Sequence, residues 1–381
     1  MRIGFNFHTS DEYISGVEYY SLGLLNALLR IDSKNDYVVF TNQPALLKKH
    51  ITPQNNLTIR DVSFLKTRVQ RIFWEHLKLP ALARDSQLDI IHCPHYICPF
   101  FTDGLKCVVT IHDTIALDNP AWCKNSNALY YNMLMGHTIK KASKIIAVSK
   151  NTAENIKRRF VFANSKTIVI HPGIDSIFHC SSDPRHQEDV RLKYHLPDKY
   201  ILFVGNIEPK KNLLNLLRAY KLLKLKGLPH KLVLAGRRSW KSGNIRKYIR
   251  SNFGRNEVVL IGYVERGDLP FIYKMADIFV FVSFCEGFGF PPLEAMTCGT
   301  AVAASSTGIM EEMNGGSFAR VDPKNPNQTA ESVYSLINDS SQRNRQVETA
   351  KRECQKFTWQ DCAEKTLTVY KEAAGFYESA K

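Results

Sequence analysis

The sequence lacks the patterns that mark membrane-spanning and secreted proteins. No apolar run approaches the roughly 18 residues that a spanning helix needs. Residues 1–7 are soon followed by polar ones, so they predict a first strand rather than a signal peptide. We therefore expect a cytoplasmic protein, which could also contact the inner face of the cell membrane peripherally.

Paired cysteines and recognisable metal-binding spacings are also missing. The nine cysteines are scattered and contain no C-x-x-C pair, so disulfides are not expected in a reducing compartment. Four residues of zinc-ligand type lie close together, but their spacing matches no zinc signature, and a buried strand end is the better interpretation. These residues are His92, Cys93, His95 and Cys98.

Acidic residues are few compared with basic ones. Lys and Arg together number 51 against 36 Asp and Glu, which gives a formal net charge of +15. Such an excess indicates an anionic partner: nucleic acid, a phosphorylated ligand or an anionic membrane. Because the chain has no helix-turn-helix, RNA-recognition or zinc-finger signature, we do not expect nucleic acid.

Short apolar runs alternate with segments of helical period along all 381 residues. This alternation predicts an α/β protein with two doubly wound parallel sheets, each covered by helices. The expected domains are 1–172 and 199–357, joined by a polar linker over 173–198. We expect a helix of about 358–381 to pack back on the first domain.

The strand ends of the second half carry glycine and basic residues. The strand over 200–204 ends in Gly205, and Lys210 and Lys211 follow where a helix begins. This pattern indicates a phosphate site, although an exposed turn with two solvated lysines would look the same. Arg237 follows the next strand, again after a glycine.

Two further strand ends in this half carry candidate ligand contacts. Tyr263 and Val264 follow the strand over 258–261, where backbone amides could read a flat base; an ordinary turn is the alternative. Glu286 lies in the loop after the strand over 278–282, and Pro292 suits the first position of a helix. Glu294 would then lie in the first turn, where it could simply complement the helix dipole.

The first half offers two candidates of the same kind. Gly16 opens a helix and can supply backbone N–H groups to a phosphate. His112 follows the strand over 107–111, where a histidine can donate to a sugar hydroxyl or transfer protons, although a lone histidine is more often structural.

Glu286 and Glu294, separated by seven residues in E-G-F-G-F-P-P-L-E, resemble the E-x7-E motif of retaining glycosyltransferases of family 4. Further segments follow in the family's order: Ile111–Asp113, Ala147–Lys150, His171–Asp175, Val204–Asn212 and Phe357–Trp359. The resemblance covers most of the chain. It implies the GT-B fold, in which two Rossmann-like domains face a central cleft.

The resemblance also implies residue roles. Glu294 would bind the ribose of a nucleotide sugar, Glu286 the transferred hexose, and Lys211 the diphosphate. His112 would contact the sugar and Gly16 the phosphate, while Glu312 matches a polar position of less certain role. The implied donor-binding residues are Gly16, Gly205, Lys210, Lys211, Arg237, Tyr263, Val264, Glu286, Gly287, Phe288, Gly289, Phe290 and Glu294, and the implied catalytic residues are His112, Glu286 and Lys211.

The sequence departs from the family at the phosphate site. Many relatives have arginine where this chain has Lys210 or Asn206, and Arg237 is the candidate for the second cation. Pro292 removes an N–H that some relatives keep.

The resemblance implies transfer with retention, with departure and attack on the same face rather than the double displacement of glycosidases. The chain has no D-x-D triplet, which agrees with transfer that needs no metal or other cofactor. The segments Thr110–Thr114 and Pro120–Trp122 look most like the mannosyltransferase branch, so GDP-mannose is the expected donor. The expected acceptor is a glycan or lipid-linked glycan of surface polysaccharide or lipopolysaccharide biosynthesis.

Other interpretations stay open. A UDP-sugar transferase for glucosyl, galactosyl or N-acetylglucosaminyl groups, or a nucleotide-sugar epimerase, would share the architecture. A polyanion-binding protein would explain the charge, although two cleft glutamates would repel phosphate-rich chains. The segment 66–74 places Val69, Ile72 and Phe73 at helical spacing beside basic residues, so it could dock on an anionic membrane or pack on its own sheet.

Overall fold

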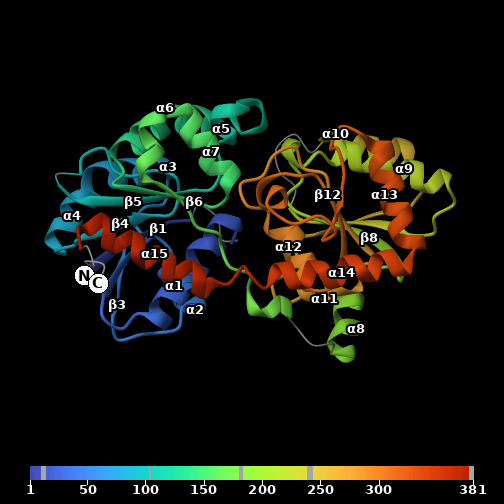
Figure 1. Ribbon diagram of the computed structural model, residues 1–381, viewed down its shortest axis with the longest axis horizontal. Coiled ribbons are helices and arrows are strands. Elements are labelled where there is room, and N and C mark those ends of the chain that lie inside the picture. The colour runs from blue at the N-terminus through green and yellow to red at the C-terminus, as the bar shows by residue number, and fades with distance from the viewer. Residues whose placement is uncertain (10–13, 103, 180–182, 238–242, 377–381) are drawn as a thin grey trace. The chain divides into compact units, whose positions relative to one another are not determined.

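The chain divides into two units, each built around its own sheet (Figure 1). Unit 1 comprises Met1–Gly173 and Phe357–Lys381, and unit 2 comprises Ile174–Lys356. The computed structural model describes residues 1–9, 14–102, 104–179, 183–237 and 243–376, apart from the side chain of Asn127. None of the described helices is long and apolar enough to cross a membrane.

Unit 1 contains a seven-stranded parallel sheet with the strand order β3-β2-β1-β4-β5-β6-β7. Most of its strands are continuous runs of buried apolar residues, as expected for strands covered on both faces. The strands are β1 (Arg2–Phe7), β2 (Asp36–Thr41), β3 (Leu57–Asp61), β4 (Ile90–Cys93), β5 (Lys106–Ile111), β6 (Lys144–Ala147) and β7 (Thr167–Val169).

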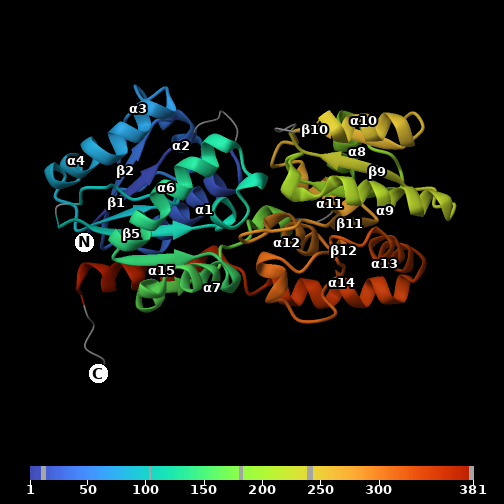
Figure 2. The ribbon, with the colours of Figure 1, turned by 90° about the horizontal axis from the view of Figure 1, so that it is seen from above.

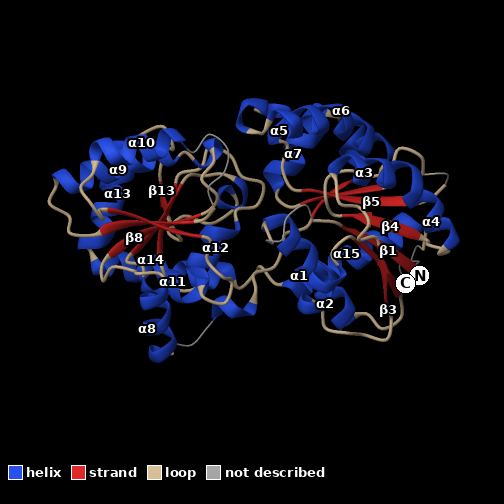
Figure 3. Ribbon diagram, turned by 180° about the vertical axis from the view of Figure 1, so that it is seen from behind, coloured by secondary structure: helices blue, strands red, loops and turns tan. Residues whose placement is uncertain are grey.

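Helices surround the strands in each unit, as the blue and red ribbons of Figure 3 show. The helices of unit 1 are α1 (Gly16–Ile31), α2 (Pro44–His50), α3 (Arg68–Phe73), α4 (Leu79–Asp85), α5 (Ile115–Asp118), α6 (Asn125–Lys141), α7 (Lys150–Arg159) and α15 (Trp359–Ala374). Short turns are the π-helical η1 (Trp74–Lys78) and the 3₁₀ turns η2 (Pro120–Trp122) and η3 (Val161–Lys166).

Helix α15 joins unit 1 from the far end of the sequence. It contacts α1, β4 and β5, and it lies beside α1 in Figure 1. The hydroxyl of Tyr370 lies 2.6 Å from His92 Nδ1, and Thr110 Oγ1 lies 2.8 Å from His92 Nε2. A Cβ on Gly23 of α1 would lie 2.3 Å from the Trp359 ring, so the glycine permits this close approach of the two helices.

Unit 2 contains a six-stranded parallel sheet with the order β10-β9-β8-β11-β12-β13. Stacked aromatic rings fill its centre, with the Phe281 ring centroid 5.9 Å from those of both Phe203 and Phe279. The two parallel sheets confirm the predicted fold class. The strands of unit 2 are β8 (Tyr200–Val204), β9 (Lys231–Ala235), β10 (Val258–Gly262), β11 (Ile278–Phe281), β12 (Ala301–Ala304) and β13 (Ala319–Arg320).

Seven helices and three 3₁₀ turns make up the rest of the described part of unit 2. The pair α13 and α14 pack side by side, as the orange-red helices of Figure 2 show. The helices are α8 (Pro184–Lys193), α9 (Leu213–Leu225), α10 (Gly243–Asn252), α11 (Leu269–Met275), α12 (Phe290–Thr297), α13 (Pro326–Asn338) and α14 (Ser340–Cys354). The turns are η4 (Ser176–His179), η5 (Pro209–Lys211) and η6 (Gly308–Glu311).

The segment 173–198, which we expected to be a linker, contains η4 and α8 and belongs to unit 2 from Ile174 onward. Helix α8 forms because Asp183 caps it: the carboxylate accepts the backbone N–H groups of Arg185 and His186, and Pro184 takes a first-turn position. Residues 180–182 lie outside the described residues.

Close contacts between strand-end loops fix the carboxyl edge of the sheet in unit 2. Gly236, after β9, has φ +143° and approaches the loop after β8 so closely that a Cβ would lie 2.0 Å from the Gly205 carbonyl oxygen. The Gly236 N–H donates to the Gly262 carbonyl at 2.7 Å. Because parallel strands end at one edge, this is where a ligand of unit 2 would bind.

Candidate active site

Two loops of unit 2 are bonded into one framework at this edge. The backbone N–H of Phe284, after β11, donates to the Lys210 carbonyl at 2.9 Å. The Asn212 amide, which stands at the N-cap of α9 with φ +55°, donates to the Val282 carbonyl at 3.0 Å. Asparagine tolerates this left-handed conformation. The loop after β8 and the loop after β11 therefore hold each other in place.

Lys211 and Glu286 form a buried ion pair inside that framework. Lys211 Nζ lies 2.7 Å from Glu286 Oε1, and the two residues are 9% and 8% exposed. Ser283 also donates to the Glu286 carboxylate, and the ammonium lies 5.0 Å from the Phe281 ring centroid. Burial alone would raise the pKa of Glu286, but Lys211, Lys210 and these hydrogen bonds hold it below its ordinary value. Glu286 is therefore a carboxylate at neutral pH.

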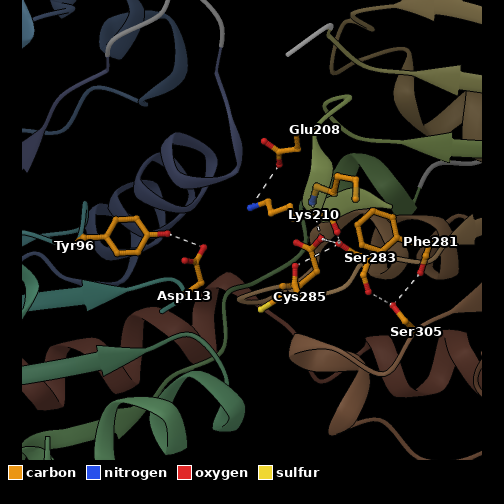
Figure 4. A network of polar contacts seen from close by, with 10 residues as sticks. Tyr96, Asp113, Glu208, Lys210, Phe281, Ser283, Cys285 and Ser305 are labelled. Atoms are coloured by element: carbon orange, nitrogen blue, oxygen red, sulfur yellow. Dashed lines mark hydrogen bonds and ion pairs between the residues drawn. The ribbon is translucent and has the colours of Figure 1, made fainter. Parts of the chain in front are cut away.

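Lys210, the neighbour of Lys211 in the sequence, pairs with a different carboxylate. Figure 4 shows Lys210 directed at Glu208, with Nζ 3.6 Å from Oε1. The Ser305 hydroxyl donates to the Ser283 carbonyl at 2.6 Å, which supports the loop from the β12 side. Arg237 contributes its carbonyl to the Ile207 N–H at 2.9 Å, and its neighbour Arg238 lies outside the described residues.

Glu294 lies in a different set of contacts from Glu286. Its carboxylate is 4% exposed and accepts hydrogen bonds from Arg266 Nη1 at 3.1 Å and from the Tyr273 hydroxyl at 3.0 Å. Burial raises the pKa of Glu294, and the opposing effect of Arg266 and Tyr273 does not fully cancel the increase. Arg266 also reaches Asp175 at 2.7 Å, so it bridges two carboxylates.

The start of α12 differs from our prediction. The helix begins at Phe290 rather than at Pro292, and Gly289 with φ +97° is its N-cap. Both prolines fit because the first N–H groups of a helix have no partner within it. Glu294 is therefore beyond the first turn, and its position is explained by Arg266 and Tyr273 rather than by the helix dipole.

Sequence reasoning missed Arg266. Its guanidinium contacts Glu294 at 3.1 Å. Arg237, which we expect to be the second cation at the phosphate, stays a prediction. Arg266 follows β10 by four residues, so the rule that ligands meet strand ends could have pointed to it.

The remaining candidates of unit 2 surround this edge. Phe288 is buried, and its carbonyl accepts the Ile309 N–H at 2.8 Å, which fixes the loop that includes Gly287. The Phe288 and Phe290 rings are 5.1 Å apart. Tyr263 is 39% exposed, whereas Val264 is buried. Glu312 is half-buried, and its N–H bonds the Ile309 carbonyl at 2.9 Å.

In unit 1, His112 is held as a neutral ring at the end of β5. Its Nε2 lies 2.8 Å from the Pro94 carbonyl oxygen, which can only accept, so this nitrogen carries the proton. Burial lowers the pKa of His112 to about 4. The Tyr20 and Tyr96 rings contact it at 4.8 Å and 5.3 Å between centroids. Nδ1 can therefore accept a proton or a hydrogen bond, which is compatible with the expected proton transfer but gives this nitrogen no proton to donate to a sugar hydroxyl.

Gly16 is the first residue of α1, where we expected a phosphate contact. Glu18 in the first turn reaches back to the N–H of Ser15 at 3.0 Å and to its hydroxyl, in a capping box. This carboxylate already complements the helix N-terminus. An anion at Gly16 would therefore have to share the helix end with Glu18.

Zinc-type residues of unit 1 have other partners. His92 is hydrogen-bonded on both nitrogens, as described above, and Cys98 Sγ lies 3.7 Å from the Thr138 carbonyl. Within the described ranges no group of three or more His, Cys, Asp or Glu side chains is arranged to hold a metal ion.

Comparison with known families and proteins gives a consistent result. Residues 186–353 match the family model "Glycosyl transferases group 1", and residues 14–178 match "Glycosyltransferase Family 4". The chain is 30% identical to an uncharacterized glycosyltransferase of Methanocaldococcus jannaschii, over 94% of each chain. It is 29% identical to the O-antigen chain mannosyltransferase B of Escherichia coli, over 76% of this chain and 75% of that one.

A similar fold occurs in the crystal structure of Anabaena HepE in complex with UDP and glucose. The TM-score is 0.74, with 18% identity over 98% of this chain and 100% of that one. The chain belongs to the glycosyltransferases, with a family 4 domain followed by a group 1 domain in the GT-B fold.

Proposed function

We propose that this glycosyltransferase transfers mannose from GDP-mannose, with retention of configuration, to a glycan or lipid-linked glycan acceptor in surface polysaccharide or lipopolysaccharide biosynthesis. The observation that carries the proposal is the similarity to an O-antigen chain mannosyltransferase over three quarters of both chains. The buried Lys211–Glu286 pair supports it, because it provides a cation and a carboxylate at the sheet edge of unit 2.

In this proposal Lys211 neutralises the donor diphosphate and stabilises the leaving nucleotide. Glu286 holds hydroxyls of the hexose, while the backbone N–H groups near Gly289 and Phe290 contact phosphate and sugar. Before the donor binds, the ion pair stabilises the empty site, because each partner lowers the free-energy cost of burying the other's charge. The phosphate would then take over part of the interaction that Glu286 makes with Lys211.

Glu294 binds the ribose diol in the same proposal. A carboxylate accepts two hydroxyl hydrogens well, and Arg266 opposes the increase in the pKa of Glu294 that burial causes. Lys210 and Arg237 supply further positive charge near the diphosphate. With these cations the reaction needs no metal ion or other cofactor.

On the unit 1 side, His112 contacts the transferred sugar and Gly16 the phosphate. Because its proton is on Nε2, His112 would accept a hydrogen bond from a sugar hydroxyl through Nδ1. Attack and departure on one face require no carboxylate nucleophile, so Glu286 acts by binding.

The test is a thermal-shift screen of GDP, UDP and ADP, followed by transfer assays. GDP at 100 times its Kd is expected to stabilise the protein by about 2.7 kcal/mol. Glu286→Ala should abolish mannosyl transfer, and NMR of the product should show the donor's anomeric configuration. Stabilisation by UDP alone, with transfer from a UDP-sugar, would reject GDP-mannose as the donor.

We also propose that α3 touches an anionic membrane. Val69 and Phe73 are each 62% exposed, Lys66 beside them is exposed, and Arg68 is half-buried. Exposed apolar side chains next to basic ones suit a membrane surface with negative headgroups. Co-sedimentation with phosphatidylglycerol vesicles, but not with phosphatidylcholine vesicles, is the expected result. Equal recovery with both, or no loss in Val69→Asp, would contradict it.

A further inference from the structure

Unit 1 contains a pocket that the donor proposal leaves unexplained. Its volume is about 670 Å³, which falls in the range of small-molecule sites. Its walls come from the loops after β1, β2 and β4, the start of α1, the segment leading into α3, α3 itself, η1 and α6.

Three cationic side chains line this pocket. The Arg68 guanidinium lies over the Tyr130 ring, 4.8 Å from its centroid. Arg71 Nε is 3.9 Å from Glu75 Oε1, too far for a hydrogen bond, and it has no other hydrogen-bond partner among the described residues. The Lys66 ammonium is likewise unpartnered within the described part of the chain.

The carboxylates among the described lining residues, Glu18 and Glu75, do not balance these cations. Glu18 contributes one negative charge, and its carboxylate accepts hydrogen bonds from the backbone N–H and hydroxyl of Ser15 at the cap of α1. Burial raises the pKa of Glu75 to about 7, against the effect of Arg71, so this carboxyl group is partly protonated at neutral pH. The described lining of the pocket, with three cations against Glu18 and a partly protonated Glu75, therefore carries a net positive charge.

Tyrosine rings form another wall. Tyr131 lies 5.1 Å from Tyr96 and 5.4 Å from Tyr130 between ring centroids. Aromatic rings with a polar tip offer an apolar face and a hydroxyl, which suits the C–H face and hydroxyls of a sugar. The Tyr96 hydroxyl donates to Asp113 at 3.0 Å, as Figure 4 shows. The Tyr96 ring also contacts His112, so the pocket reaches the proposed sugar-binding histidine.

A buried histidine in the pocket wall lacks a hydrogen-bond partner among the described residues. His8 is 2% exposed, and neither ring nitrogen forms a hydrogen bond within the described residues. Buried polar side chains nearly always have a partner, because leaving one unpaired costs about 1–3 kcal/mol. A hydroxyl-bearing ligand in the pocket would supply it.

We propose that this pocket binds the acceptor, and that the acceptor is a phosphate-bearing glycoside. The phosphate lies among Lys66, Arg68 and Arg71, and the sugar packs on Tyr130 and Tyr131. Arginine forks bind phosphate through paired hydrogen bonds, and three cations suit a di- or trianion better than a single carboxylate. The inference rests on the proposed function, because it names the substrate class of the same reaction.

The test is calorimetric titration of the full chain with a short-chain alkyl mannosyl diphosphate and with the matching alkyl mannoside. The diphosphate is expected to bind at least about tenfold more tightly, and Arg71→Gln should remove that advantage. Arg158→Gln on α7 is the matched control and should bind as the wild type does. Lys66→Gln repeats the measurement at an exposed side chain, in case Arg71→Gln does not fold.

The proposal would be overturned by equal binding of the two glycosides, by equal binding of a phosphate-free alkyl glucuronide, or by loss of binding in Lys210→Gln with none in Arg71→Gln. The last would place the probe in unit 2. Inorganic pyrophosphate should bind more weakly than the glycoside, and equal binding would reject sugar recognition here. Hydrolysis of GDP-mannose in the absence of acceptor tests the donor separately. If the protein binds the diphosphate probe but does not hydrolyse GDP-mannose, the proposed function is rejected and the pocket proposal is not.

Discussion

The two units bury ionisable groups of different character beneath similar parallel sheets. Unit 1 buries histidines that are neutral, including His8, His92 and His112, because burial lowers their pKa values to about 3, 3 and 4. Unit 2 buries carboxylates beside cations, as in Glu286 with Lys211. The contrast teaches that one architecture can offer neutral hydrogen-bonding groups on one sheet and fixed charge on the other.

The largest expected effect is that acid destabilises unit 1 at a higher pH than unit 2. A histidine whose pKa is lowered in the folded state binds its proton more readily when unfolded. Stability is therefore fully present above the unfolded pKa of about 6.5 and is lost as pH falls toward 4. At pH 5 the free energy of unfolding should be lower than at neutral pH by about 2 kcal/mol for each of four histidines: His8, His76, His92 and His112. As the pH is lowered, the backbone amides of unit 1 should lose protection from hydrogen exchange before pH 4.5 is reached.

Unit 2 should resist the same pH. The lowered pKa of Glu286 gives stability that is lost only as pH falls below the ordinary glutamate value. In unit 1, Glu75 acts in the opposite direction, since its raised pKa makes folding more favourable as pH falls from 7 to 4.5, but one group does not offset four. If the amides of both units lost protection from hydrogen exchange equally at pH 5, the predicted difference in acid sensitivity would be wrong.

The next effect concerns the charged pair of unit 2. Lys211→Met leaves Glu286 buried without its cation, which should cost about 3–5 kcal/mol of stability. Transfer should fall by about 10²–10³-fold because the diphosphate loses its charge partner. Lys221→Met, an exposed lysine on α9, is the control for urea denaturation and for kcat/KM. Wild-type activity in Lys211→Met would remove this residue from the site.

Arg266 controls the charge of the second buried glutamate of unit 2, Glu294. Arg266→Gln should raise the already elevated pKa of Glu294 further, so the pH at which donor binding is half-maximal should move upward. The donor KM should rise about 10–100-fold. Arg218→Gln, on the exposed side of α9, serves as the control. An unchanged pH profile would mean that Arg266 acts only in packing.

The smallest expected effect is that of metal removal. If Lys210, Lys211 and Arg237 supply the positive charge at the diphosphate, treatment with EDTA should change the rate by less than about twofold. Restoration of a lost rate by Mg²⁺ or Mn²⁺ would show that the cations of unit 2 are not sufficient.

The sequence predicted the strand ends well because each one is a local pattern of apolar run, glycine and polar residue. It did not predict that Lys211 and Glu286 pair, since they are 75 residues apart and only the adjacency of β8 and β11 brings them together. Arg266 was missed because its partner Glu294 lies on another element. Adjacent prolines left the start of α12 ambiguous. The roles of these residues toward a donor stay predictions.

The return of α15 to unit 1 has a consequence for biosynthesis. Unit 2 is fully translated once residue 356 has been added, whereas unit 1 still lacks the helix whose Tyr370 bonds His92 and whose Trp359 packs on Gly23. On the ribosome the second unit can therefore complete its core first. Until α15 emerges, the apolar surfaces of α1, β4 and β5 that it covers remain open to chaperones.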